Sequence, residues 1–427
     1  MKIAPSKRQL EFLDWEFGAF FHFGIRSFFR NHKDWDGQEM PASAFDPQEL
    51  DCEQWIRTAK EAGMTYAILT AKHHDGFANW PSKYTSYSVA ASPWKGGKGD
   101  VVREFVDACR KYDMKVGLYY SPAQWTETEE VSFQNSKEYD DYFIHQISEL
   151  LGNYGTIDYL WFDGNGSQKH EFDKARIIRT IRTLQPEIRI FSMWDPDTRW
   201  VGNEDGYADL PNFSTLEHAV ISVESDQPEE YSTMKFLPAE CDMKMRSTWF
   251  DCEENEDTIK ELDELLGIYE MSVGRGANLL LNIGPDRRGL LSEADTKRLL
   301  EFGAAIRERY GKALDFSEMA PVDGTEDAYF IQTADFTEEW GVKVTSPLVN
   351  RVMLSEDLTE GESVRAFRIY AHLPNYRPRR VCVYQGQSIG HKAICVFPTI
   401  RTAKLVVEIE DHDGTYRLLD MKAFYAK

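Results

Sequence analysis

The chain has 427 residues, of which 42% are hydrophobic, so it can bury a large core and is too long for one ordinary domain. Its formal net charge of −22 argues against nucleic acids and anionic membrane surfaces as partners. The sequence contains no membrane-spanning apolar run and its first residues lack the apolar centre of a secretory signal, so we expect a cytoplasmic protein.

Up to about residue 312, short apolar runs alternate with amphipathic helical patterns, such as the one that follows the expected N-cap Asp51. Continuous apolar runs between such helices are typical of parallel strands buried on both faces. About eight such units over about 300 residues predict a (β/α)8-type barrel rather than an open doubly wound sheet. The expected strands cover residues 18–24, 64–71, 114–121, 157–164, 188–195, 245–251 and 277–284.

Two regions depart from this alternation. Residues 196–244 are rich in Asp, Glu, Asn and Pro and show little helical periodicity, so we expect a long lid or binding loop there. After about residue 318 the pattern alternates as in exposed strands, with turn signals in between, and predicts a C-terminal antiparallel β-sandwich. We therefore expect a catalytic barrel over 1–315 and a sandwich over 316–427. No Gly/Ser-rich tether separates them, which favours a buttress for the barrel over an independent sugar-binding module.

Enzymes built on such barrels carry their catalytic groups at the C-terminal ends of the strands. The inventory of these ends is rich in histidines, aromatic residues and acids, and it contains no GxSxG serine motif. Two carboxylates from different strands, set among aromatic walls, suit glycoside hydrolysis, which needs one ionised and one protonated acid. The strand ends deliver His22, Lys72, His73, His74, Asp75, Tyr119, Tyr120, Ser121, Trp161, Asp163, Trp194, Asp195, Arg246, Trp249 and Asn282, with Arg199 and Glu204 just beyond the fifth strand.

Each of these residues also has a simpler structural explanation. Asp163 before a glycine can merely end a strand in a turn, although a turn does not require the preceding Trp-Phe pair. The adjacent His73 and His74 would face opposite ways on a regular strand, so contacts to substrate hydroxyls are favoured over a shared metal. His22 can be a core histidine, and Glu204 lies in an acidic loop where most acids are solvated. A metal-dependent hydrolase using His22, His73 and His74 stays open as an alternative.

The six cysteines of the chain show no CxxC pair and no regular spacing. Such a pattern favours scattered reduced thiols over a disulfide framework or a zinc site.

Several motifs resemble alpha-L-fucosidases of glycoside hydrolase family 29 over roughly residues 8–315. The resemblance is carried by HFG (22–24), KHHDGF (72–77), WFDG (161–164) and GRGANLLLNIGPDRRGLL (274–291). WVGNEDG (200–206) and LPAECDMKMRSTWF (237–250) resemble the subgroup that acts on alpha-1,3/1,4-linked fucose. The family also carries a β-sandwich after its barrel.

The resemblance implies a retaining exo-hydrolase that releases terminal L-fucose from fucosylated oligosaccharides without a metal or another cofactor. It assigns the nucleophile to Asp163. It assigns the acid/base to Glu204, as in the subgroup, with Glu240 as the alternative that other members suggest. Retention predicts that the two carboxyl groups lie about 5–5.5 Å apart. The positions expected to bind substrate are His22, Trp35, Glu39, His73, His74, Tyr120, Trp161, Arg199, Arg246 and Trp249.

Three rival functions stay open from the sequence. A fucosidase can prefer another linkage, and an exo-glycosidase of this type can accept a related sugar. A fucose-binding lectin would keep the site and lose the turnover, although the presence of two candidate carboxylates argues against it.

Overall fold

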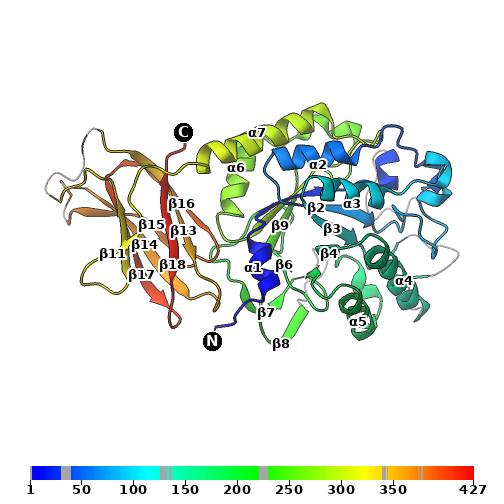
Figure 1. The fold of residues 1–427 in the computed structure, drawn as a ribbon, viewed down its shortest axis with the longest axis horizontal. Coiled ribbons are helices and arrows are strands. Elements are labelled where there is room, and N and C mark those ends of the chain that lie inside the picture. The colour runs from blue at the N-terminus through cyan, green and yellow to red at the C-terminus, as the bar shows by residue number, and fades with distance from the viewer. Residues whose placement is uncertain are drawn as a thin grey trace.

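The computed structural model describes residues 2–29, 40–125, 132–133, 137–220, 229–338, 343, 345–373, 375–376 and 378–427. Figure 1 shows two parts lying side by side: a barrel wrapped by helices and a smaller all-β unit that contains the C-terminal strand. Within the described residues, no helix has the length and apolar character needed to cross a membrane.

The barrel is one eight-stranded sheet in which every neighbouring pair of strands is parallel. An isolated parallel bridge between Phe191 and Thr198 brings the two edges together and almost closes it. The predicted barrel is therefore confirmed. In spatial order the strands are β5 (Arg189–Phe191), β4 (Tyr159–Phe162), β3 (Lys115–Tyr120), β2 (Tyr66–Lys72), β1 (Phe17–Phe21), β10 (Asn278–Asn282), β9 (Ala239–Lys244) and β6 (Arg199–Trp200).

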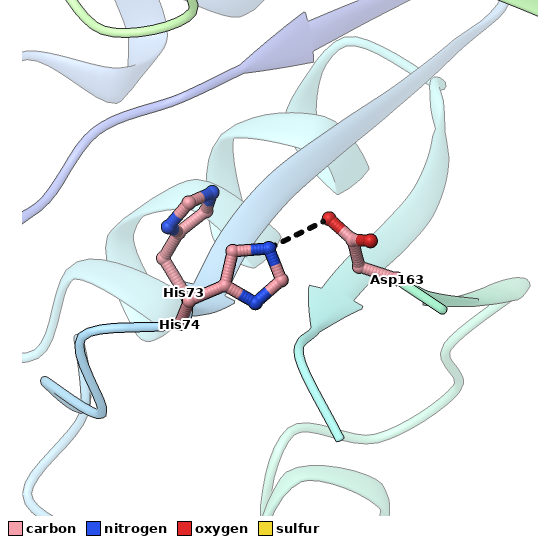
Figure 2. Close-up of side chains that lie close together, drawn as sticks. All are labelled: His73, His74 and Asp163. Atoms are coloured by element: carbon pink, nitrogen blue, oxygen red, sulfur yellow. Dashed lines mark ion pairs between the residues drawn. The ribbon is translucent and has the colours of Figure 1, made fainter. Parts of the chain in front are cut away.

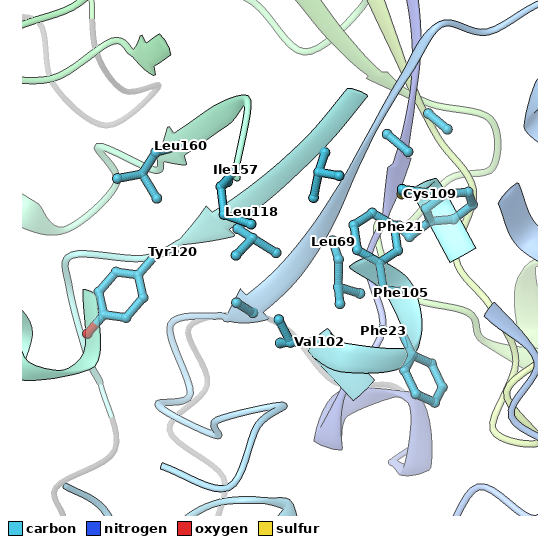
Figure 3. Close-up of a cluster of buried hydrophobic side chains, with 14 of the residues drawn as sticks. Phe21, Phe23, Leu69, Val102, Phe105, Cys109, Leu118, Tyr120, Ile157 and Leu160 are labelled. Carbon is cyan, nitrogen blue, oxygen red and sulfur yellow. The ribbon is translucent and has the colours of Figure 1, made fainter. Parts of the chain in front are cut away.

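The helices pack around this sheet and bury its outer face. Side chains of β2 and β3, among them Leu69 and Leu118, contact Val102 and Phe105 of the third helix (Figure 3). The side chain of Asp51 accepts a backbone N–H in the first turn of the second helix, so the predicted N-cap is confirmed. The α-helices are α1 (Lys7–Leu13), α2 (Cys52–Glu61), α3 (Val101–Lys111), α4 (Lys137–Asn153), α5 (Lys174–Leu184), α6 (Leu262–Met271) and α7 (Glu293–Tyr310).

Large rings fill the interior of the barrel. Phe12 and Trp15, at the N-terminal helix, pack against Tyr66 and Tyr159 and close its lower end. Gly18 makes room for this packing, because a Cβ atom there would lie 2.4 Å from a ring carbon of Tyr66. The remaining buried members of the interior cluster are Phe20, Ile68, Tyr119, Trp161, Phe191, Trp200 and Leu280.

The strand expected at 245–251 is wrong, because β9 occupies Ala239–Lys244 and the following residues form bends. The sequence of β9 resembles a polar loop because it contains two acids, Glu240 and Asp242, which face the interior. The region 196–244 as a whole was expected to be irregular and instead also contains β6 and a hairpin. The hairpin consists of β7 (Thr215–Ala219) and β8 (Glu229–Phe236).

The C-terminal part forms two antiparallel sheets around their own apolar core, as predicted. Glu270 of α6 pairs with Arg309 of α7 at 3.1 Å and with Arg351 of the sandwich at 2.8 Å. These contacts tie the sandwich to the barrel helices, which is the arrangement expected of a buttress. The strands are β11 (Ala320–Pro321), β12 (Ala328–Gln332), β13 (Leu348–Glu356), β14 (Val364–His372), β15 (Arg380–Gly386), β16 (Ala393–Arg401), β17 (Lys404–His412) and β18 (Leu418–Phe424).

Replacing Gly18 with alanine should destabilise the barrel, because the new methyl group would overlap the Tyr66 ring. Overpacking of this kind costs about 1–3 kcal/mol. Gly152→Ala in α4 is the matched control, since nothing lies within 4 Å of the added atom and alanine favours the helix. Urea denaturation of both variants measures the difference. A Gly18→Ala midpoint equal to that of Gly152→Ala would contradict the packing described here.

Candidate active site

Asp163 lies at the C-terminal rim of the barrel, directly after β4. Side chains alternate along a strand, so Tyr159, Trp161 and Asp163 face the same side. Tyr159 and Trp161 belong to the interior cluster, and the side chain of Asp163 is 24% exposed. The strand therefore carries its rings inside the barrel and presents the carboxylate at the opening.

Three donors hold the Asp163 carboxylate. The Tyr119 hydroxyl donates to Oδ2 at 2.7 Å, and Nε2 of His74 lies 3.2 Å from the same oxygen (Figure 2). The backbone N–H of Asn165 donates to Oδ1 at 2.9 Å. Burial acts to raise the pKa of Asp163, but the charge of His74 and these hydrogen bonds outweigh it, so the pKa lies below its ordinary value. The group is thus an ionised carboxylate, as a nucleophile must be.

His74 is held from its other side. Its Nδ1 lies 2.6 Å from Oγ of Ser121, and the Ser121 hydroxyl donates to the carbonyl of Ala123 at 2.7 Å. The ring stacks on Trp125, with the centroids 4.3 Å apart. Because the Ser121 hydroxyl donates to Ala123, its oxygen can accept from Nδ1 of His74, while Nε2 of His74 faces the Asp163 carboxylate.

His22 is neutral and presents an acceptor to the site. Burial lowers its pKa to about 3, and its Nδ1 donates to Oδ1 of Asn282 at 2.7 Å. The orientation of the Asn282 amide is fixed, because its Nδ2 donates to the carbonyl of Trp249. Nε2 of His22 is left to accept a hydrogen bond, for example from a sugar hydroxyl. The Trp249 ring lies 4.9 Å from the His22 ring and forms an apolar wall beside it.

Four rings from neighbouring strands form a continuous stack beneath Asp163, which we call the ring stack: Phe191, Trp161, Tyr119 and His73. Successive centroids lie 4.1, 5.4 and 5.5 Å apart, with interplanar angles of 10, 20 and 10°. Burial, followed by the charge of His74, lowers the pKa of His73 well below its ordinary value. Its buried Nδ1 has no hydrogen-bond partner among the described residues. The stack therefore ends in a neutral histidine with an unused polar atom.

Glu204 lies in the loop after β6 and is 34% exposed. The loop is joined to β9 by a bridge between Asp205 and Met243. Lys244, the last residue of β9, pairs with the Glu204 carboxylate at 3.0 Å and lies 4.7 Å from the centre of the Trp249 ring. Lys244 and Trp249 thus connect Glu204 to His22 and to the wall of the site.

Glu240 has a different environment. It lies inside the barrel with none of its surface exposed, and it accepts hydrogen bonds from Tyr66, Tyr159 and Trp161. Burial raises its pKa to about 7. A carboxyl enclosed in this way is screened from a glycosidic oxygen at the rim, which favours Glu204 as the acid/base.

Tyr120 faces away from Asp163. Its hydroxyl donates to Gln146 of α4 at 2.7 Å, and its ring belongs to the outer core (Figure 3). The neighbouring Tyr119 pairs in register with Trp161 and shares its inward face. Tyr119, and not the expected Tyr120, is therefore the tyrosine of the site.

Two predicted arginines are also directed elsewhere. Trp200 faces the interior, where its indole donates to Asp242, so the preceding Arg199 points outward and donates to the Asn212 side chain. Arg246 is buried and forms two hydrogen bonds to Asp295 of α7. Arg199 is therefore held by Asn212 and Arg246 by Asp295, and neither arginine contacts Asp163.

The expected binding residues Trp35 and Glu39 lie outside the described residues. The strand-end inventory contained Tyr119, Ser121 and Asn282 without assigning them a role in the site, and it lacked Lys244. Lys244 was missed because β9 was not predicted, while the roles of the other three depend on the partners that the tertiary structure gives them.

One group of His and acid side chains among the described residues can supply metal ligands. Atoms of His73, His74 and Asp163 lie within 4.8 Å of one another (Figure 2). His22, expected in the alternative metal set, is not part of this group, and its Nδ1 is taken by Asn282. Within the group His74 already lies at hydrogen-bond distance from Asp163, whereas Nδ1 of His73 has no partner among the described residues.

Comparison with known proteins identifies the family. The sequence profile described as Alpha-L-fucosidase matches residues 3–311. "Putative alpha-L-fucosidase 1" of Oryza sativa subsp. japonica is 32% identical over 95% of this chain and 82% of its own length. "Alpha-L-fucosidase 1" of Arabidopsis thaliana is 38% identical over 70% of this chain and 59% of its own length.

Solved structures agree with this result. The structure of a putative alpha-L-fucosidase from Bacteroides thetaiotaomicron covers 100% of this chain and 98% of its own, with 31% identity and a TM-score of 0.87. A glycoside hydrolase 29 family member from a rumen bacterium is 30% identical with the same TM-score, and the match covers 100% of this chain and 78% of that chain. The chain therefore belongs to the alpha-L-fucosidase family and is a glycoside hydrolase.

Proposed function

We propose that the protein is a retaining exo-alpha-L-fucosidase that releases terminal alpha-1,3/1,4-linked L-fucose from oligosaccharides or glycoconjugates. The observation that carries the proposal is the Asp163 carboxylate, which stays ionised at the barrel rim under three donors. Glu204, partly exposed and paired with the Lys244 ammonium that also lies over the Trp249 ring, is the partner carboxyl. A pair of this kind performs glycoside hydrolysis by double displacement.

In the first step Asp163 attacks the anomeric carbon while Glu204 donates its proton to the leaving glycosidic oxygen. The bond to the leaving group breaks and a fucosyl ester forms on Asp163. In the second step Glu204 removes a proton from a water molecule, which attacks the same carbon and breaks the ester. The carboxylate of Asp163 is a better leaving group because His74 and Tyr119 stabilise its charge.

Recognition of fucose would use the neutral histidines and the rings. Nε2 of His22 can accept a hydrogen bond from a ring hydroxyl, and the unused Nδ1 of His73 offers a second polar contact. Trp249 presents an apolar surface to the sugar ring and its methyl group. A hydroxyl left without its partner would cost about 1–3 kcal/mol, which gives the site its selectivity.

The linkage preference is proposed from the motif around Glu204. WVGNEDG at residues 200–206 resembles the subgroup that acts on branched alpha-1,3/1,4-linked fucose. Because this loop also carries the proposed acid/base, its conformation determines how the leaving sugar approaches the proton. A branched aglycone would therefore be selected at the same place where the bond breaks.

Asp163→Ala should lower kcat on an aryl alpha-L-fucoside by about 10⁴-fold or more, because the covalent step is lost. Added azide should restore part of the turnover and give the β-fucosyl azide, which NMR identifies. Asp195→Ala is the matched control, since Asp195 also follows a strand but pairs with Arg182 at 2.8 Å. Near-normal turnover by Asp163→Ala would remove Asp163 from the role of nucleophile.

Glu204→Ala should lose about 10²–10⁴-fold in kcat/KM on a fucoside with a poor leaving group, which needs the proton, and much less on an activated aryl fucoside. The same pair of substrates applied to Glu240→Ala should show no such difference. Azide with Glu204→Ala should give the α-azide. A flat leaving-group response at Glu204 together with a steep one at Glu240 would transfer the acid/base role to Glu240.

A panel of fucosylated oligosaccharides that differ only in linkage tests the substrate proposal. Release of free fucose should be fastest from branched alpha-1,3- and alpha-1,4-linked substrates and at least about tenfold slower from alpha-1,2-linked ones, a difference of about 1.4 kcal/mol in transition-state binding. Equal rates across the panel would contradict the linkage preference and leave the fucosidase activity intact.

A further inference from the structure

Glu240 is a buried carboxyl that the proposed reaction does not use. The Tyr66 hydroxyl donates to its Oε2 at 2.6 Å, and its Oε1 accepts from the Trp161 indole at 2.8 Å and from the Tyr159 hydroxyl at 3.2 Å. The donors come from β2 and β4, while Glu240 comes from β9. In the sheet, β1 and β10 lie between β2 and β9. The carboxyl therefore joins strands that are not neighbours through the interior of the barrel.

Burying a carboxyl in this way lowers the stability of the fold, so its presence suggests a functional reason. Removing a charged carboxyl from water costs several kcal/mol of folding free energy. A well-packed apolar side chain at the same position often makes the protein at least as stable. Burial raises the pKa of Glu240 to about 7 even though three donors act to lower it. Gly18 also leaves space for the Tyr66 ring, whose hydroxyl reaches Glu240. Packing alone does not call for an acid among these rings.

Trp161 connects Glu240 to the site. Its indole N–H is directed at Glu240, while its ring stacks on Phe191 and on Tyr119. The Tyr119 hydroxyl in turn donates to Asp163 at 2.7 Å. The angle at which the Trp161 ring lies thus sets the position of the next ring, which carries the donor to the proposed nucleophile.

We propose that Glu240 is a positioning residue that fixes Trp161 through its indole N–H and thereby aligns the Tyr119 hydroxyl with Asp163. The inference rests on the proposed role of Asp163 as the nucleophile. It gives Glu240 a function in the same reaction without any transfer of a proton to the substrate.

The test is a double-mutant cycle on an activated aryl alpha-L-fucoside with Glu240→Gln, Trp161→Phe and both together. Glutamine keeps the shape but offers one neutral acceptor oxygen to the three donors and places an NH2 group beside one of them. Phenylalanine keeps a ring in the stack and removes the same N–H. Each single change should lower kcat about 10- to 100-fold, as small misplacements near a reacting group do, with KM changed by less than about threefold.

The double variant should be no slower than the slower single variant, because both changes act through the same Glu240–Trp161 contact. Losses that multiply in the double variant would overturn the proposal. Glu240→Gln should also lose the same factor on good and poor leaving groups. A markedly larger loss on the poor leaving group would identify a proton donor and overturn it as well.

Glu356→Gln is the matched control. Glu356 is a buried carboxyl of the sandwich that accepts the backbone N–H of Ser363 at 2.7 Å and of Val364 at 3.2 Å. The Glu356→Gln variant should have a lower melting temperature than the wild type and an unchanged kcat. If Glu240→Gln behaves in the same way, the proposal fails. If Glu240→Gln does not fold, a Trp161→Phe variant as fast as the wild type refutes it.

Failure of the proposed function would look different. In that case the wild type would release no fucose from the aryl fucoside, or Asp163→Ala would keep its turnover. Loss of activity in Asp163→Ala together with wild-type kinetics in Glu240→Gln would refute the positioning role alone.

Discussion

The structure depends on keeping the Asp163 carboxylate charged at a largely buried position. Desolvation favours the neutral acid, and only donors held in fixed positions reverse that preference. Those donors come from the end of β3, from the segment after β2 and from the backbone beyond β4. A barrel of parallel strands brings these three chain segments to one rim, which explains why the fold suits this site.

The interior below the rim contains two buried acids among its rings. Glu240 and Asp242, both on β9, each accept an indole N–H, from Trp161 and Trp200 respectively. Burial, and then the charge of Glu204, raises the pKa of Asp242 well above its ordinary value. Directed hydrogen bonds set the angle of a ring, which apolar packing does less strictly. Two buried acids of β9 therefore hold the indole rings of Trp161 and Trp200 below the rim.

Fold and family do not by themselves define the chemistry of this chain, because barrels of this type support many reactions. The family match is specific, and the rim supplies the corresponding groups: an ionised acid, a neutral His22 whose Nε2 can accept, and a second acid beside Lys244. The sandwich contributes through α6 and α7, where Glu270 joins the two parts of the protein. It contacts the helices that surround the barrel.

The sequence alone determined the barrel, the sandwich and the location of Asp163, because strand and helix periodicities and strand-end acids are local features. It did not determine which face of a strand a residue occupies. Tyr119 rather than Tyr120 meets Asp163 because the pairing of β3 with β4 puts Tyr119 level with Trp161. It also missed β9, whose two acids resemble a loop until partners from β4 and β6 satisfy them. Register and buried hydrogen bonds join residues distant in the chain, so only the tertiary structure decided them.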